Sequence, residues 1–394
     1  MDFNLNEEQV ALRDSVVRLL AQHYGFDKRR AIAAGEPGWS EPVYRQLAAL
    51  GVTGLRIAPV AGGFGGSAID LMPVMQEFGK ALLLEPILAS AVMGATAVAR
   101  GGCRAADADL LSAVARGEVI LAFAHDEPAS RHAPLWIETR AQRTSNGWRL
   151  DGRKYNVLHA GAAHRFVISA RVGGEAGACE GLGLFLVDAR CAGLQLRTYK
   201  LIDDSPAGEM RLEDVPAVPL GEPGSAWPAI EGTLNAGIAA VCAEAVGAME
   251  GAYALTANYL NTRRQFGRLI GENQALRHRV AEMVVSLECA RSMALLAAVA
   301  LDDPDAVESS DLMRAKLIIG RHARSLCQWA VQLHGGIGMT EEYAVGHYLR
   351  RITVIDQLFG DSASQASRLA DRLLGHSTMD AAVRSVAFTE PGHA

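Results

Sequence analysis

Residues 259–267 read YLNTRRQFG and residues 332–340 read QLHGGIGMT. The first stretch combines two arginines with two aromatic rings, and the second places three glycines within four residues. Packing alone does not require such combinations, because glycine lets a backbone come close to a bound group and arginine is suited to bind anions. We therefore take these two stretches as the functional motifs of the chain and assign the rest of the sequence outward from them.

The region around both motifs is predicted to be helical. From about residue 226, apolar residues recur at steps of three and four, as they do along the buried stripe of a helix. Similar runs cover about 276–293 and about 308–333, and a last run follows Asp361. Four long amphipathic helices in succession favour a four-helix bundle over residues 223–394.

The preceding part of the chain divides into a helical and a β region. Residues 1–118 read as helices joined by glycine-rich turns and are predicted to form an N-terminal helical domain. Residues 119–222 contain short apolar or alternating runs, with a hairpin signal at Asn146 and Gly147, and are predicted to form a middle β domain. Residues 214–219 are interpreted as the linker that leaves this domain.

Composition limits the classes of function. The 394 residues carry a formal net charge of −6, which argues against a nucleic-acid-binding protein. The six cysteines lie far apart without metal-ligand spacing, so they indicate reduced thiols and no metal site. The acidic, polar start predicts no signal peptide, and no stretch reads as long and apolar enough to span a bilayer. A cytoplasmic protein without a membrane association is expected.

Both motifs resemble signature regions of the acyl-CoA dehydrogenase family, and the helical–β–helical order resembles that family over nearly the whole length. Within the family, the chain is most similar to the small subunits of bacterial heteromeric enzymes of the pimeloyl-CoA dehydrogenase type. That similarity rests on the two motifs, on residues 38–40 and on residues 85–86. The resemblance implies an α+β multidomain fold with a helical N-terminal domain, a β-barrel-like middle domain and a C-terminal four-helix bundle that binds FAD and oligomerises.

The resemblance assigns cofactor roles to the first motif. An arginine presents a rigid fork of donors that matches a diphosphate, so Arg263 suits the diphosphate of FAD. In the family this contact is made to the flavin of the neighbouring subunit, with Phe266 against the cofactor and Gln274 hydrogen-bonded to it. The alternative for Arg263 is a surface salt bridge at a helix end.

The resemblance also assigns cofactor roles to the second motif and to a loop of the β domain. Gly335 and Gly336 allow the backbone to approach the cofactor, with Gln332 beside them. Residues 123–131 match the loop that lies against the flavin ring, so Phe123 and Ser130 are cofactor-binding candidates. This loop keeps Glu-Pro but lacks the Gly-Ala-Gly that usually follows, and residues 154–161 lack the usual tryptophan and threonine.

The catalytic base is missing from the places where the family carries it. The family removes the α-proton of an acyl-CoA with a carboxylate, usually a glutamate, found at one of two positions. In this chain these positions are Phe359 and Gly237. Asp361 is the nearest candidate base, and Asp356 is a weaker one. The alternative for Asp361 is a cap of the last helix, because a capping-box pattern follows it.

The expected function is FAD-dependent α,β-dehydrogenation of an acyl-CoA, with electron-transfer flavoprotein as the electron acceptor. The missing base favours a hetero-oligomer in which a second acyl-CoA dehydrogenase subunit supplies the glutamate. Three alternatives stay open: a self-sufficient homo-oligomeric enzyme that uses Asp361, a non-catalytic structural subunit, and an oxidase or monooxygenase on the same fold.

Overall fold

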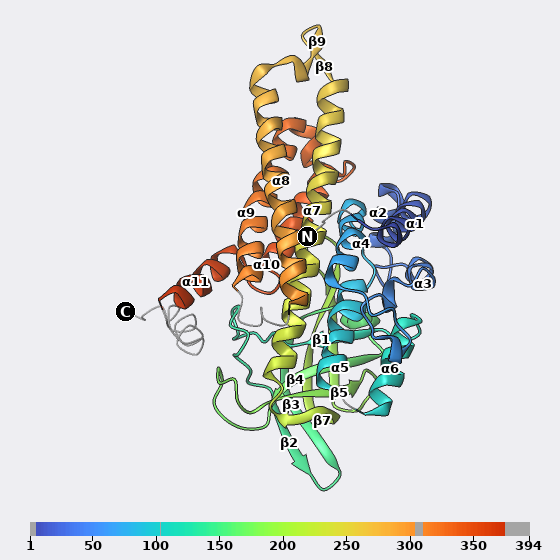
Figure 1. The fold of residues 1–394 in the computed structure, drawn as a ribbon, viewed down its shortest axis with the longest axis vertical. Helices are drawn as coiled ribbons and strands as arrows, with labels where there is room; N and C mark the ends of the chain where they lie inside the picture. The colour runs from blue at the N-terminus through green and yellow to red at the C-terminus, as the bar shows by residue number, and fades with distance from the viewer. Residues whose placement is uncertain (1–4, 103, 304–309, 375–394) are drawn as a thin grey trace. The chain divides into compact units, whose positions relative to one another are not determined.

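The computed structural model describes residues 5–102, 104–303 and 310–374. Cys103 lies outside these residues, and the described cysteines are free thiols. Helical segments precede and follow a β-sheet (Figure 1), so the predicted helical–β–helical order is confirmed. The exact domain boundaries stay predictions.

The described chain forms two compact units, which we treat one at a time. The bundle unit comprises the described part of Met1–Ala34, together with Ser67–Leu83 and Ile238–Gln365. The sheet unit comprises Gly35–Gly66, Leu84–Gly237 and the described part of Ala366–Ala394.

The described strands of the sheet unit form one seven-stranded sheet that closes on itself. Its strands are β1 (Leu121–Ala124), β2 (Arg140–Thr144), β3 (Gly147–Leu158), β4 (Arg165–Arg171), β5 (Leu182–Asp188), β6 (Leu194–Lys200) and β7 (Pro206–Gly224). The pairs β4–β2, β2–β3, β3–β7, β7–β5 and β5–β4 complete a ring, and β1 and β6 are added at β4 and β7. The ring encloses buried apolar side chains such as Leu150, Phe166 and Phe185, so the middle part is barrel-like as expected.

Short helices accompany the sheet in this unit. They are α3 (Glu41–Ala49), η1 (Val52–Gly54), η2 (Pro59–Ala61), η3 (Ile87–Gly94), α5 (Ala95–Gly101), α6 (Ala105–Ala115) and η4 (Ala160–Ala162). The π-helix η3 is buried along its whole length, and Ser90 within it accepts a hydrogen bond from the backbone N–H of Leu121 in β1 at 3.0 Å. This bond fixes the first strand against η3.

The bundle unit consists mainly of helices. They are α1 (Glu7–His23), α2 (Phe26–Ala34), α4 (Ala68–Ala81), α8 (Gln274–Asp302), α9 (Asp311–His334), α10 (Val345–Gln357), and the part of α7 (Trp227–Thr262) from Ile238 onward. A capping box at Asn6 starts α1. Buried ion pairs join the helices, as between Arg351 of α10 and Glu244 of α7 at 2.6 Å. The final helix, α11 (Ser362–Leu373), follows α10.

Helices α4 and α7 cross at an unusually short distance. A Cβ atom built on Gly247 of α7 would lie 1.8 Å from the backbone oxygen of Gln76, and one on Gly79 of α4 would lie 1.9 Å from that of Glu244. Real Cβ atoms do not approach backbone this closely, so the crossing requires glycine at both positions.

Two details of the sequence analysis were wrong. Residues 214–219 belong to the long strand β7 and not to a linker, with Pro216 opposite Arg149 and Pro219 opposite Phe185. Helix α10 was not anticipated, and it supplies a further helix of the bundle unit before α11.

Two helices are long and apolar enough to cross a membrane, which corrects the expectation that no such stretch exists. They are α7 and α8, whose most apolar windows are 67% and 28% buried, respectively. Length and composition are weak evidence here, because core helices of soluble proteins pass the same test. The exposed apolar surface of α8 nevertheless distinguishes it from α7.

Candidate functional site

Arg263 lies directly after the last residue of α7, at one end of the bundle unit. Its backbone N–H donates to the carbonyl oxygen of Tyr259 at 2.8 Å, which continues the helical pattern by one step. Its side chain is exposed and, within the described residues, makes no hydrogen bond or ion pair. The salt bridge considered as an alternative is therefore not formed within the described chain, and the guanidinium is free to bind an anion.

Phe266 forms the tip of a two-stranded hairpin that joins α7 to α8 (Figure 1). The strands are β8 (Arg264–Gln265) and β9 (Arg268–Leu269). Phe266 and Gly267 both have positive φ, of 53° and 81°, as the central residues of a type I′ turn do. The Phe266 ring is fully exposed. A large apolar ring held at a tight turn is positioned to contact a second molecule.

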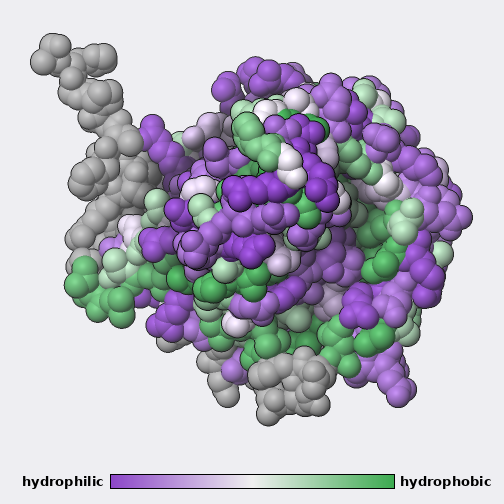
Figure 2. Space-filling view, turned by 90° about the horizontal axis from the view of Figure 1, so that it is seen from above, coloured by the Kyte–Doolittle hydropathy of each residue, from purple (hydrophilic) through white to green (hydrophobic). Residues whose placement is uncertain are grey.

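Gln274 is the first residue of α8 and is exposed, close in sequence to the same hairpin. The short helix η5 (Ile270–Glu272) connects the two. Asn273 accepts from the guanidinium of Arg268 at 2.7 Å and donates to the carbonyl of Ile270 at 2.9 Å, which orders this connection. The surface seen in Figure 2 is largely hydrophilic with apolar patches between, in keeping with this mixture of arginines and exposed apolar residues.

Gly335 and Gly336 directly follow α9 and are the first two residues of the 3-10 helix η7 (Gly335–Met339). Gly335 has φ 65° and ψ −142°, a backbone conformation that residues other than glycine rarely adopt. A Cβ atom on either glycine would meet no atom within 4 Å. The backbone of the two glycines is therefore not covered by other described atoms. Gln332, about one turn earlier on α9, is also exposed.

These features fit the diphosphate end of FAD. A free guanidinium, two exposed amides and an uncovered glycine backbone supply the charge-assisted and neutral donors that a diphosphate and its adjoining groups require. In this chain Arg263, Gln274, Gln332 and the two glycines would hold it, and the motifs that carry them lie in one unit.

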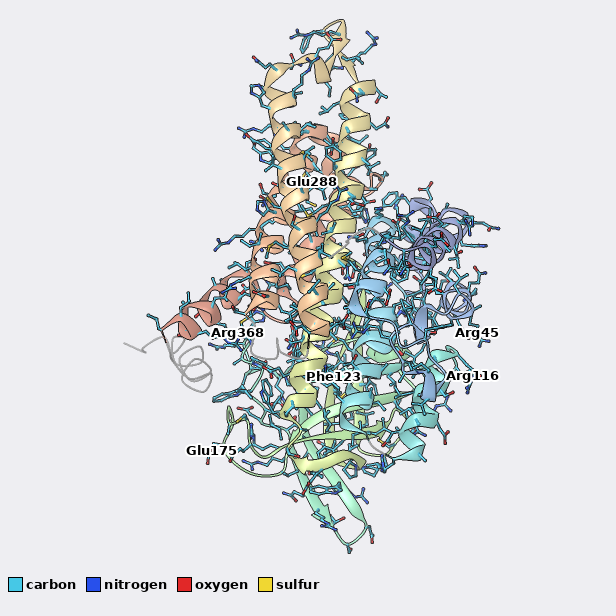
Figure 3. The ribbon with its side chains drawn as sticks, in the orientation of Figure 1. Arg45, Arg116, Phe123, Glu175, Glu288 and Arg368 are labelled. Carbon is cyan, nitrogen blue, oxygen red and sulfur yellow. The ribbon has the colours of Figure 1, made fainter. Side chains whose placement is uncertain are left out.

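In the sheet unit, Phe123 (labelled in Figure 3) is buried in β1. Its ring stacks on that of His125 with centroids 5.5 Å apart and planes 8° from parallel. The Nδ1 atom of His125 is 3.0 Å from the hydroxyl of Ser169. Burial lowers the pKa of His125 to about 3, so its ring is neutral at physiological pH.

A buried ion pair anchors the loop that follows β1. The Lys154 ammonium donates to the Glu127 carboxylate at 2.8 Å, to the carbonyl of His125 at 3.0 Å and to the Ser169 hydroxyl at 3.1 Å. Since Lys154 can only donate to Ser169, that hydroxyl is left to donate to Nδ1 of His125, which places the ring proton on Nε2. The arrangement fixes both the loop and the orientation of the ring.

Glu127 also binds the segment before β2. It accepts from the backbone N–H groups of Glu138 at 2.6 Å and Thr139 at 3.0 Å. Burial acts to raise the pKa of Glu127, but Lys154 and these donors outweigh it and hold the pKa below its ordinary value. Ser130 is buried in the same loop and donates to the carbonyl of Glu127 at 2.8 Å. The Ser130 hydroxyl thus stabilises the loop through a hydrogen bond within it.

The stretch that replaces the usual ring-covering segment has an irregular backbone. The pairing of β3 with β7 shifts between Lys154 and Val157, and Asn156 has φ 52°. His159 also has φ 52°, and its Nε2 atom lies 2.7 Å from the carbonyl of Leu84, so the ring donates to the backbone. This contact supports a structural role for His159.

The carboxylate of Asp361 lies at the start of α11. It accepts from the backbone N–H of Ser364 at 2.8 Å and from the Ser364 hydroxyl at 2.7 Å. Gln365 is buried and donates from its amide to the carbonyl of Phe359 at 2.9 Å. Phe359 itself has φ 61°. The segment where the family carries its base is therefore held by a helix cap and a buried amide.

Asp356 is buried beneath the same segment. Its carboxylate pairs with Arg324 at 2.5 Å and accepts from the Ser362 hydroxyl at 2.6 Å. The ammonium of buried Lys316 donates to the last carbonyls of α10, those of Ile355 at 2.8 Å and Asp356 at 2.9 Å. A carboxylate with two such partners is poorly placed to accept a substrate proton.

The structure brings some of the expected site residues together and adds others. The two motifs lie in one unit, whereas Phe123 and Ser130 belong to the other. Sequence reasoning missed Lys154, although a charged residue in the middle of a half-buried strand is a sign of an internal ion pair. It also missed a role for His334 within the second motif. No cluster of three or more potential metal ligands occurs among the described residues.

The comparisons with known proteins agree with this architecture. Family models match residues 6–118, as the N-terminal domain of acyl-CoA dehydrogenase, and residues 224–374, as its C-terminal domain. The chain is 30% identical over 370 residues to the L-prolyl-[peptidyl-carrier protein] dehydrogenase of Pseudomonas fluorescens, covering 89% of this chain and 93% of that protein. It is 26% identical over 343 residues to the caffeyl-CoA reductase–Etf complex subunit CarC of Acetobacterium woodii, covering 85% and 90%.

A solved structure gives the same result. A variant of the Tcur3481–Tcur3483 steroid acyl-CoA dehydrogenase matches with a TM-score of 0.86 and 29% identity, covering 94% of this chain and 98% of that chain. The expected cofactor, FAD, and the expected class, an oxidoreductase that acts on acyl-CoA, are those of the matched family. The chain belongs to the acyl-CoA dehydrogenase family.

Proposed function

We propose that this chain is one subunit of a heteromeric acyl-CoA dehydrogenase whose second, related subunit supplies the catalytic glutamate. The observation that carries the proposal is the absence of a carboxylate at both positions where the family places its base, which are Phe359 and Gly237 in this chain. A phenylalanine and a glycine have no group that can accept the α-proton.

The remaining carboxylates near Phe359 support the proposal because they have structural partners. Asp361 caps α11 through Ser364. Asp356 is held by Arg324 and Ser362. These contacts hold both carboxylates in place, so recruiting either one as a base would require breaking them. The self-sufficient alternative, with Asp361 as base, therefore needs a rearrangement of the start of α11.

The exposed end of the bundle unit is the part that this chain contributes to the shared site. Arg263 is free and exposed, and Gly335 and Gly336 lie over open space. We infer that this end binds the diphosphate of the FAD held by the partner subunit, with Gln274 and Gln332 as further donors. The fully exposed Phe266 ring would be covered by the same contact.

Each group has a defined part in the reaction. When bound, FAD would supply the group that accepts a hydride from the β-carbon of the acyl group, and the partner's glutamate would accept the α-proton. This chain's Arg263 offsets the charge of the diphosphate and fixes the cofactor's position. The buried Glu127–Lys154 pair orders the loop that follows β1 and carries Ser130.

The electrons must then leave the flavin, and we infer electron-transfer flavoprotein as the acceptor. The relative CarC is described as a subunit of a reductase–Etf complex, which supports this inference. The name of the matched steroid enzyme joins two components, Tcur3481 and Tcur3483, which supports a pairing of two related chains.

A second candidate substrate is an acyl group attached to a carrier protein instead of to coenzyme A. The relative at 30% identity is described as acting on prolyl groups of a peptidyl-carrier protein. Coenzyme A and a carrier protein both present an acyl thioester on a pantetheine arm, so assays with each carrier separate the two substrates.

The test is to purify the chain alone and together with a co-expressed related subunit, and to compare visible absorbance, native mass and acyl-CoA-dependent dye reduction. We expect turnover and a full flavin band only in the hetero-oligomer. Normal turnover by the chain alone would refute the heteromeric proposal. A complex without flavin would instead indicate a structural subunit, and oxygen consumption would indicate an oxidase.

A further inference from the structure

His334 is the last residue of α9 and stands directly before the Gly335 turn. Its side chain is only 3% exposed, although the adjacent glycines are exposed. Burial lowers the pKa of His334 more than the nearby carbonyls of Ala330 and Leu255 raise it, so the ring is neutral near pH 7. A polar ring buried beside an open turn has a cost that needs a compensating contact.

The ring also makes aromatic contacts, which join three segments. The ring of His334 stacks on Tyr259, with centroids 4.5 Å apart and planes 27° from parallel. It also contacts Tyr343 at 5.0 Å and 49°. Ring pairs at such separations attract one another. The histidine thus links the end of α7, the end of α9 and the stretch before α10.

A hydrogen bond fixes the orientation of the ring. Nδ1 lies 2.7 Å from the carbonyl oxygen of Ala330 in the preceding helical turn. A carbonyl only accepts, so Nδ1 carries the proton of the neutral ring. The ring is therefore held by a hydrogen bond within its own helix, by stacking on Tyr259 and by a tilted contact with Tyr343, which together restrict its position.

The stack relates the two motifs to each other. The backbone N–H of Arg263 donates to the carbonyl of Tyr259 at 2.8 Å, so the residue that stacks on His334 lies one helical turn before Arg263 along the chain. On its other side His334 is bonded directly to Gly335, whose φ of 65° starts the open turn. A displacement of the His334 ring would therefore change the spacing between Arg263 and the glycine backbone.

We propose that His334 is a positioning residue for the diphosphate end of the cofactor. Through its ring contacts with Tyr259 and Tyr343 it fixes the end of α7 that precedes Arg263 relative to the glycine turn, and so sets the spacing of the two motifs for FAD. This inference rests on the proposed function, in which this end completes the FAD site of the partner subunit.

The test compares FAD binding by hetero-oligomers that carry His334→Ala, His334→Phe or the control His322→Ala in this chain. His322 lies on the same helix and, within the described residues, has no hydrogen bond or ion pair. We expect the FAD dissociation constant to rise about tenfold in His334→Ala and less in His334→Phe, which keeps a stacked ring. Excess FAD should restore kcat, with the KM for acyl-CoA unchanged.

The outcomes separate the two proposals. If the wild-type hetero-oligomer binds no FAD, the proposed function fails. If the wild type binds FAD and His334→Ala binds it equally well, the positioning role is refuted while the proposed function stands. If His334→Ala does not fold, Tyr343→Leu decides the matter: weaker FAD binding by roughly threefold supports the role, and wild-type binding refutes it.

Discussion

At the scale of single residues, the carboxylate of Asp361 accepts two hydrogen bonds from Ser364 and so satisfies the first turn of α11. The first N–H groups of a helix have no partner within the helix, which makes the helix less stable. An aspartate at the helix start accepts from one of them and so stabilises the helix. The same side chain was the nearest candidate for the catalytic base in sequence. The two candidate roles, helix cap and catalytic base, require different groups, so substitutions can separate them.

Asp361→Ala removes the cap and is expected to lower the free energy of unfolding by about 1 kcal/mol. Asp361→Asn keeps a side-chain oxygen that caps nearly as well, so we expect a much smaller loss. Urea unfolding of the purified chain, followed by circular dichroism, measures both. Equal stability of Asp361→Ala and wild type would show that the cap contributes nothing.

The buried pair of Glu127 and Lys154 is a second residue-scale feature with a measurable cost. The carboxylate has a pKa below its ordinary value of 4.5 in the folded chain. It therefore contributes stability that is fully present above the unfolded-state pKa and is lost as the pH falls through the folded-state pKa. Lys154 is the main reason for this shift.

Lys154→Met leaves the Glu127 charge buried and unpaired, so we expect a loss of about 3–5 kcal/mol at pH 7. Without its partner the carboxyl group takes up a proton more readily, so the deficit relative to wild type should narrow as the pH falls toward about 4. Urea titrations at both pH values test this. The control is Arg190→Met, an exposed cation of the same unit; a pH-independent deficit would contradict the account.

At the scale of elements, the crossing of α4 and α7 depends on the absence of side chains at Gly79 and Gly247. A methyl group on Gly247 would overlap the backbone of Gln76. The backbone of a packed helix cannot move aside, whereas the end of a flexible side chain can change its rotamer. The two helices would have to separate, and the buried contacts around them would loosen.

Gly247→Ala is therefore expected to destabilise the bundle unit by about 1–3 kcal/mol or more, despite the better helix propensity of alanine. Thermal and urea unfolding measure the change. Ala254→Leu adds a larger group on the exposed face of the same helix and should be nearly neutral. A more stable Gly247→Ala variant would mean that the helices do not approach as described.

The elements also show how far sequence reasoning reaches. The amphipathic stripes of α7, α8 and α9 and the hairpin signal before β3 are local patterns, and these elements form where they were predicted. Helix α10 was missed because its inward side includes His347 and Asp356, so it lacks a purely apolar stripe. β7 was taken for a linker because of Pro216 and Pro219, which it accommodates near the point where its partner changes from β3 to β5.

For the candidate site, sequence identified the motif residues but not the contacts that hold them. Arg263 and Gly335 stand out by residue type and neighbours. The stacking of His334 on Tyr259 joins residues that are distant in sequence, and the ion pair of Glu127 with Lys154 joins the loop after β1 to β3. Such contacts depend on the tertiary fold, and no local pattern encodes them.

At the scale of the whole molecule, the proposed enzyme divides its chemistry between two related chains. In this proposal the chain contributes the end that binds the diphosphate, and the carboxylates of its base region keep their structural partners. The partner subunit is expected to provide the flavin-ring pocket and the glutamate. A division of this kind makes the flavin content of the complex depend on residues of the subunit that lacks the base.

Arg263→Ala is expected to yield a hetero-oligomer of normal mass that purifies with little FAD, because the charge-assisted bonds to the diphosphate are lost. Arg263→Lys should restore FAD binding only in part, since an ammonium lacks the guanidinium fork. The matched control is Arg321→Ala, an exposed arginine on α9. Full flavin content in Arg263→Ala would place the diphosphate elsewhere.

The most direct measurement is the anaerobic bleaching of the flavin band by acyl-CoA in a hetero-oligomer that carries Asp361→Asn in this chain. If the base belongs to the partner, the flavin bleaches at the wild-type rate, because the amide keeps the cap and takes no part in proton transfer. A complex that keeps its flavin and its fold but no longer bleaches would contradict the account and assign the base to Asp361.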